Sequence, residues 1–241
     1  MTDLLDKLDS YSRKARLYPA LLVSLPVALS VTLILPGFTF EKFLPIIIAA
    51  GIPFFTMSVV RIRGQRLQKK LEKTWGGLPT TQMLRIVGGE ANRVSVDRRR
   101  RLLAKFIGEP LPTEEEEREN PLEADQRYIL ATRILIARVR DQREKYPRVH
   151  DENVGFGFWR NLLALKPFAL AMLTLTIIAN GIALAYTREV SGALIAILLN
   201  IAFAACWLTI VKADRVQQQG ETYAERLYET LENLTSDGSS D

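Results

Sequence analysis

The sequence predicts an all-α integral membrane protein with two transmembrane helical hairpins, a helical cytoplasmic insert and a C-terminal cytoplasmic helix. Four stretches of about 18 to 22 residues carry no charge, and each is long enough to cross a hydrocarbon core of about 30 Å. The connection within each pair of stretches is short, which makes the paired helices antiparallel. Lys and Arg gather at the ends remote from those connections.

These apolar stretches fix the predicted order of elements along the chain. They are residues 18–35, 43–60, 167–186 and 190–211. The expected parts are a cytoplasmic N-terminal segment (1–17), a first hairpin (18–60), a cytoplasmic helical domain (61–166), a second hairpin (167–211) and a cytoplasmic C-terminal helix with a frayed tail (212–241). The rest of the chain offers too little apolar surface to bury four such helices. No cleavage site of a signal peptide follows the first stretch.

Basic residues predict the orientation of the four helices. Each outer turn holds a single basic residue, Lys42 or Arg188. The other flanks are richer in cations: Lys7, Arg13, Lys14 and Arg16; Arg61, Arg63, Arg66, Lys69, Lys70 and Lys73; Arg160 and Lys166; Lys212 and Arg215. By the positive-inside rule, both termini and the insert lie in the cytoplasm, and the protein is a multi-pass protein of a bacterial inner membrane.

The same bias accounts for the net charge of +5 and the pI near 9.4. About 23 of the 32 Lys and Arg residues lie between Arg61 and Lys166, where they serve as the orientation signal and can bind anionic lipid headgroups. The run of four arginines at 98–101 lacks interleaved aromatic residues, so nucleic acid is not an expected partner.

Residues for conventional catalysis are scarce. Cys206 and His150 are the single residues of their types, and His150 is expected in a loop. One histidine without a cysteine cluster builds no recognisable zinc site, and no phosphate-binding or nucleophile motif occurs. We therefore expect no enzyme, no catalytic residue, no cofactor and no metal.

The four spans contain no ionisable residue, which disfavours a transporter or a small channel. Asn180 and Asn200 lie in the last two spans. Each either hydrogen-bonds to a neighbouring helix or lines a polar seam between subunits. Small residues of the second hairpin, such as Gly181 and Ala196, permit close packing and favour a homo-oligomer.

The cytoplasmic insert is predicted to be helical throughout. Helices are expected at 61–74, from a cap at Thr80 or Thr81 through Leu84, at 92–107, after a cap at Thr113, and at 121–145. The four acids at 114–117 fit a helix start, where the macrodipole favours negative charge. The apolar face of 121–145 is too broad for a lone surface helix, so it must pack on other insert helices or on another subunit. The tail is expected to form an amphipathic or coiled-coil helix.

Two segments have compositions that are not needed to form the spans or the helices. Trp75, Gly76, Gly77, Pro79, Thr80 and Thr81 form either a loop that couples to a partner or a tight corner between helices. Phe156, Phe158, Trp159 and Arg160 precede the third span, and there they suit a membrane interface, with aromatic rings and a cation at the headgroups.

Two motifs carry a family resemblance. Trp-Gly-Gly-x-Pro-Thr-Thr at 75–81 and Glu-Asn-x-x-x-Gly-x-x-Arg-Asn-Leu-x-x-Leu-Lys-Pro at 152–167 resemble a family of bacterial four-helix inner-membrane proteins without an assigned activity. The layout of that family is similar to membrane effectors of anti-phage defence systems. The resemblance implies no site residues.

The sequence favours an oligomeric membrane effector or sensor. Its cytoplasmic domain would receive a soluble partner protein or a ligand, and its hairpins would alter membrane integrity or signalling. A membrane scaffold that recruits a soluble partner is the alternative, ahead of a small channel or transporter. The expected partners are the lipid bilayer, further copies of the chain and a soluble cytoplasmic protein.

Overall fold

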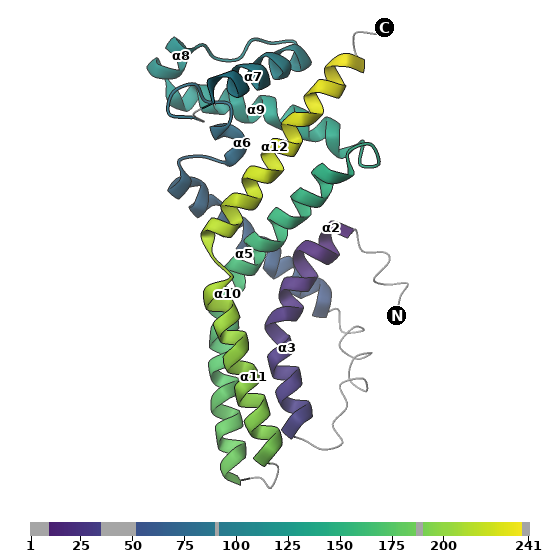
Figure 1. Ribbon diagram of the computed structural model, residues 1–241, viewed down its shortest axis with the longest axis vertical. Coiled ribbons are helices and arrows are strands. Elements are labelled where there is room, and N and C mark those ends of the chain that lie inside the picture. The colour runs from purple at the N-terminus through teal and green to yellow at the C-terminus, as the bar shows by residue number, and fades with distance from the viewer. Residues whose placement is uncertain (1–9, 35–51, 90–91, 187–189, 238–241) are drawn as a thin grey trace. The chain divides into compact units, whose positions relative to one another are not determined.

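The computed structural model describes residues 10–34, 52–89, 92–186 and 190–237, and every regular element within them is a helix (Figure 1). The elements are α2 (Ser10–Ser12), the π-helical segment η1 (Arg13–Leu17), α3 (Tyr18–Ile34), α5 (Ile52–Trp75), α6 (Pro79–Gln82), α7 (Arg93–Ile107), α8 (Glu114–Glu119), α9 (Pro121–Arg140), α10 (Pro147–Tyr186), α11 (Val190–Thr209) and α12 (Ala213–Asp237). The predicted all-α class is confirmed for this part of the chain.

Three of these helices are long and apolar enough to cross a membrane. They are Arg13–Ile34, which joins η1 to α3, then α10 and α11. Such helices indicate a membrane protein. The predicted second stretch, residues 43–60, lies partly outside the described residues, and α5 is not among the three. Four spans and the hairpin layout therefore stay predictions.

The chain divides into two compact units, which are described separately. Unit 1 comprises Met1–Lys69 and Gly157–Val216, and unit 2 comprises Lys70–Phe156 and Gln217–Asp241. The predicted boundaries at 61, 166 and 212 separate membrane from cytoplasmic parts and stay predictions. Unit 2 includes most of the C-terminal helix, which the sequence analysis treated as a separate tail.

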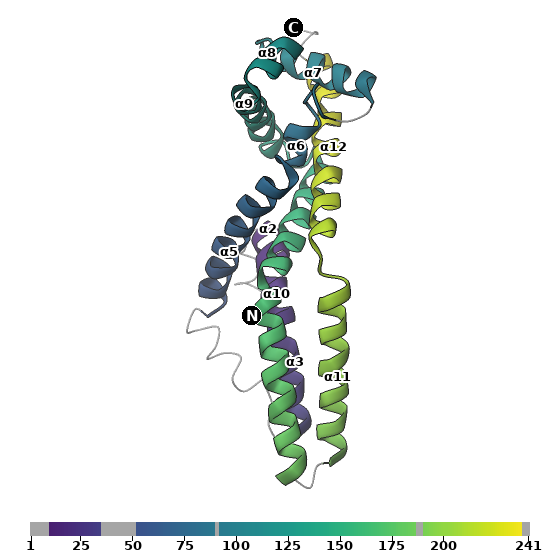
Figure 2. The same cartoon turned by 90° about the vertical axis from the view of Figure 1, so that its left-hand side faces the viewer.

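In unit 1, α3, α10 and α11 run side by side (Figures 1 and 2). Apolar side chains such as Leu173 and Trp207 are buried between the helices. A Cβ atom added to Gly192 would lie 2.3 Å from the Leu33 carbonyl oxygen, so this glycine permits the close approach of α11 to α3. Large apolar side chains also face outward, among them Leu175, Ile182 and Leu198. An apolar exterior suits a bilayer better than water.

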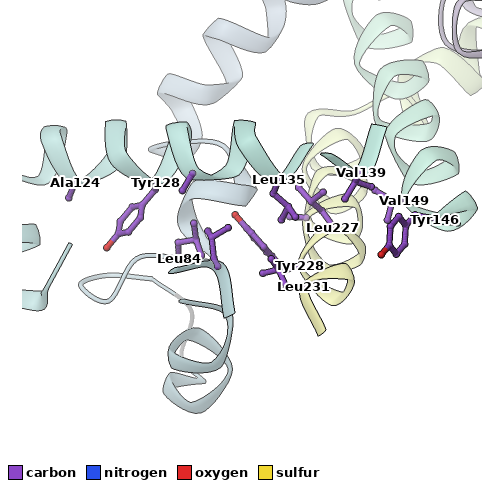
Figure 3. Close-up of a cluster of buried hydrophobic side chains, with 13 residues drawn as sticks. Leu84, Ala124, Tyr128, Leu135, Val139, Tyr146, Val149, Leu227, Tyr228 and Leu231 are labelled. Carbon is purple, nitrogen blue, oxygen red and sulfur yellow. The ribbon is translucent and has the colours of Figure 1, made fainter. Parts of the chain in front are cut away.

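Unit 2 has its own hydrophobic core, built mainly by α9 and α12 (Figure 3). Tyr128 and Leu135 on α9 are fully buried, as are Leu227 and Leu231 on α12. The recurrence of these residues every three, four or seven positions places them on one face of each helix. The predicted amphipathic tail is thus a core helix of unit 2.

Several predicted helix ends agree with the structure. Helix α5 continues to Trp75 and stops at Gly76, whose φ of 73° is left-handed and favours glycine. Helix α7 ends at Gly108 in the same conformation, with φ of 74°. Thr113 and Glu116 form a complete capping box at the start of α8.

The predicted cap at Thr80 or Thr81 is wrong. Helix α6 starts at Pro79, with Leu78 in the extended conformation before it. Proline suits the first helical position because its missing N–H group would have no partner there. Thr81 is buried instead of capping the helix.

The prediction for residues 141–166 also needs correction. Helix α9 ends at Arg140 rather than at 145, and a turn leads into α10 at Pro147. Proline disfavours a helical conformation for the residue before it, and Tyr146 turns into the core. His150, which was predicted in a loop, is therefore helical, and the segment 156–160 lies in the same helix. Pro167 lies inside α10, where it removes one hydrogen bond without ending the helix.

Candidate functional site

A buried polar cluster joins the three long apolar helices of unit 1. The amide Nδ2 of Asn200 on α11 donates to Ser30 Oγ on α3 at 2.8 Å, and Asn180 Nδ2 on α10 donates to the same oxygen at 3.2 Å. All three residues are at most 3% exposed. One hydroxyl thus connects the three helices, and we call these residues the Ser30 cluster.

The hydrogen bonds of the cluster explain why Ser30 can accept twice. Its hydroxyl donates to the Pro26 carbonyl oxygen at 2.9 Å, which leaves both lone pairs of the oxygen for the two amides. Asn200 also donates to the Ala196 carbonyl oxygen at 2.7 Å. Its own Oδ1 is buried with no hydrogen-bond partner among the described residues. None of these groups is charged near neutral pH, so neutral hydrogen bonds alone join the three helices here.

A groove of about 390 Å³ lies beside the cluster, between α3 and α10. Its lining is apolar apart from Ser30, Thr176 and Asn180. No charged side chain lines it. The groove therefore fits an apolar group better than an ion.

A second polar junction in unit 1 centres on Asn161, which is fully buried on α10. Its Nδ2 donates to the Ala15 carbonyl oxygen in η1 at 2.6 Å. A Cβ atom on Gly64 of α5 would lie only 1.8 Å from Asn161 Oδ1. The glycine inside α5 therefore makes room for Asn161. Sequence reasoning placed Asn161 in the motif at 152–167 without assigning it a contact, and it did not single out Gly64, although an isolated glycine in a helical pattern is a known packing signal.

The expected interface residues fall in both units. Phe158 and Trp159 of unit 1 are partly exposed, and their rings pack edge to face at 5.6 Å. Arg160 is 9% exposed and donates to Gln68 and Asn161, and its place at the headgroups stays a prediction. Phe156 belongs to unit 2 and lies beside Gly220.

The loop at residues 75–81 is a closed corner in unit 2. Gln82 Nε2 donates to the carbonyl oxygens of Trp75 and Gly77, and Gly77 N donates to Glu72 O at 2.8 Å. Gly77 has a φ of 135°, and a Cβ atom there would lie 3.0 Å from Arg85 Nη2. The backbone needs glycine for both reasons. A coupling role for this corner stays a prediction.

Tyr228 on α12 links the Thr80 carbonyl group of α6 to α9 within unit 2. Its hydroxyl donates to the Thr80 carbonyl oxygen at 2.8 Å and lies 3.0 Å from Thr132 Oγ1 on α9. Burial in the core raises the pKa of the Tyr228 hydroxyl, which stays protonated at physiological pH. Pro79 packs near Gly220, where an added Cβ would lie 3.1 Å from Pro79 Cγ.

Glu117 fixes the loop after α6 and was not distinguished from its acidic neighbours in the sequence. Its carboxylate accepts from Ile86 N and Val87 N at 3.0 Å and from the Tyr128 hydroxyl at 2.8 Å. The residue is 4% exposed. Burial and the hydrogen bond to Glu117 raise the pKa of Tyr128 to about 12. Glu114 and Glu116 lie in the first turn of α8, where the macrodipole favours negative charge. The macrodipole does not predict the contact between Glu117 and the loop after α6.

The described residues contain no group of three or more His, Cys, Asp or Glu side chains that could hold a metal ion. No family model matches the chain, and comparison with curated proteins and with solved structures gives no match. The function must therefore be argued from the two units themselves.

Proposed function

We propose that the chain is an oligomeric effector or sensor of the bacterial inner membrane. Unit 2 receives a soluble partner or a ligand in the cytoplasm, and the membrane helices alter membrane integrity or signalling in response. Anti-phage defence is the setting that the family resemblance favours.

One observation carries this proposal: a single chain combines three membrane-capable helices with a second unit that has its own core. A protein that served only as a membrane anchor would need no second unit with a core of its own. The Ser30 cluster supports the proposal further, because its neutral hydrogen bonds are individually weak in a bilayer, at about 0.6 kcal/mol on average. Helices joined in this way can rearrange at modest cost.

The proposal includes four passes, with both termini in the cytoplasm. The test fuses a reporter that is active only in the periplasm to successive positions. Fusions after Phe40 or Arg188 should be active, and fusions after Arg101 or at Asp241 should be silent. Periplasmic activity after Arg101 would reject the two-hairpin topology.

We propose the corner at residues 75–81 as the coupling element, because it directly follows α5 and two left-handed glycines shape it. The experiment measures membrane potential in cells that carry the native neighbouring genes, before and after phage infection. Wild type should depolarise the membrane, whereas Trp75→Ala and Gly76→Val should not, at equal abundance in the membrane. Val94→Ala is the control, since Val94 on α7 is 76% exposed and belongs to no proposed coupling or pairing surface.

A membrane scaffold is the competing function. It is favoured by the absence of Asp, Glu, Lys, Arg and His from α3, α11 and residues 167–186 of α10. Wild-type cells that keep their potential and growth under every trigger would favour the scaffold over the effector.

A further inference from the structure

The exposed side of α9 carries an apolar row that the fold leaves uncovered. Leu122, Leu130 and Ile134 lie on one row of the helix at multiples of four residues and are 77%, 58% and 45% exposed. The opposite side of α9 is buried through Tyr128 and Leu135. The helix therefore has two apolar faces, and the core uses only one.

Charge divides the exposed face of α9 along its length. Glu123 lies in the first turn, and no acidic residue occurs between Asp125 and Asp141. Arg133, Arg138 and Arg140 occupy the second half, are exposed, and form no ion pair or hydrogen bond with the part of the chain that the structure describes.

Many other arginines of unit 2 are paired. Examples are Arg85 with Asp125, Arg93 and Arg118 with Glu114, Arg98 with Glu232, Arg127 with Glu116 and Arg226 with Glu229. By contrast, the arginines in the second half of α9 lie beside an apolar row, and none of the acidic residues that the structure describes in unit 2 pairs with them. The chemistry of this face calls for a partner that is apolar at its centre and acidic at one end.

The first half of α9 has that chemistry. We propose that the exposed face of α9 binds the same face of a second copy, with the two helices antiparallel about a twofold axis near Leu130. Glu123 lies seven residues before Leu130 and Arg138 eight residues after it. At 100° per residue both side chains are on the same flank of the row, about 20° and 80° from Leu130. An antiparallel pair then sets Glu123 of each copy against Arg138 of the other.

The antiparallel arrangement is the one that the charges favour. A parallel pair would place Glu123 of the two copies at one level and Arg138 of the two copies at another, so neither carboxylate would meet an arginine. About an axis at Leu130, Arg127 instead meets Ile134 of the second copy. Because the same surface is used on both sides, the contact closes at two subunits. The inference rests on the proposed function, which requires an oligomer, and it names a surface that forms one.

The experiment measures the mass of the full-length chain in mild detergent by light scattering over a range of concentrations. Wild type should dimerise through this face, and Glu123→Arg or Arg138→Glu should each raise the dissociation constant at least tenfold. The double variant E123R/R138E should return to within threefold of wild type, because the ion pairs form again with reversed sign. Arg101→Glu is the matched control, an exposed arginine on α7 that should leave the constant unchanged.

A second variant separates pairing from folding. Leu130→Ser should also weaken association at least tenfold, with an unchanged melting temperature, because Leu130 is 58% exposed in the single chain. Charge variants with wild-type mass, or a double variant that fails to recover, would overturn this surface and favour an acidic partner protein or anionic lipid on it. Depolarisation by wild type, measured separately, decides the proposed function whatever the outcome here.

Discussion

The two units bury similar side chains but face different surroundings. In unit 1, α3, α11 and residues 167–186 of α10 are apolar on both the inside and the outside, and neutral groups such as Ser30 and Asn200 join them. Unit 2 is apolar inside and largely polar outside, with ion pairs such as Arg85–Asp125 and a buried carboxylate at Glu117. Water drives the folding of unit 2 by the hydrophobic effect, whereas helices in lipid associate through packing and hydrogen bonds.

The largest expected effect comes from truncating one buried side chain in each unit, which tests this comparison directly. Leu227→Ala in unit 2 and Leu173→Ala in unit 1 both remove side chains that are at most 2% exposed. The first should cost about 2–5 kcal/mol, because transfer from water and the cavity both count. The second should cost less than half as much, because lipid is as apolar as the site. Chemical unfolding in nanodiscs, followed by hydrogen exchange of each unit, measures both, and equal losses would contradict the distinction.

A glycine substitution tests packing in unit 1 without a change of polarity. Gly64→Ala places a Cβ atom 1.8 Å from Asn161 Oδ1, so the amide must move and its bond to Ala15 O is strained. The expected loss is about 1–3 kcal/mol. Gly181→Ala should have no such effect. Thermal melting in detergent compares the two variants, and equal melting temperatures would count against the junction.

Removing the central hydroxyl of unit 1 should have a smaller effect. Ser30→Ala deletes the acceptor of both Asn180 and Asn200, at a cost of about 0.6 kcal/mol per hydrogen bond. Ser24→Ala on the same helix is the control, because the Ser24 hydroxyl bonds only within α3. A difference in melting temperature between these two variants isolates the contribution of the cluster.

The smallest expected effect concerns acid pH in unit 2. Hydrogen bonds from Arg118 and Arg93 lower the pKa of Glu114, and hydrogen bonds from Thr113 lower the pKa of Glu116. A carboxyl pKa lowered by folding stabilises above the unfolded value, near 4.5, and that stability is lost as the pH falls through the folded value. Both groups are exposed, so the loss should be slight and weaker in high salt. Glu114→Gln with Glu116→Gln should flatten the melting temperature of unit 2 below pH 5.

The sequence predicted best those features whose signal lies within a single helix. Charge-free length predicted α3, α10 and α11 as membrane-capable helices, and glycine or capping residues predicted the ends of α5 and α7 and the start of α8. Proline was less reliable, since Pro147 begins a helix that continues through Pro167. Its effect depends on whether the lost hydrogen bond is tolerated by its surroundings.

Candidate site residues were likewise identified from the sequence in some cases and only from tertiary contacts in others. Asn180 and Asn200 were identified because polar residues are rare in such spans, but the residue that joins them, Ser30, was one hydroxyl among several. Glu117 belongs to the run of four acidic residues at 114–117, all of which suit the start of a helix. Only the packing of α8 against Ile86 and Tyr128 distinguishes it.

By itself, the sequence determined the helical class, three membrane-capable helices and the helix ends at Gly76, Gly108 and Thr113, because chain length, hydrophobicity and backbone preference act within one helix. The tertiary structure decided what distant segments do together: α12 completes the core of unit 2, Gly64 makes room for Asn161, and α9 has one face buried and the other open. These contacts join residues far apart in the chain. Their free energy depends on burial and mutual geometry, which a periodic pattern in one segment cannot specify.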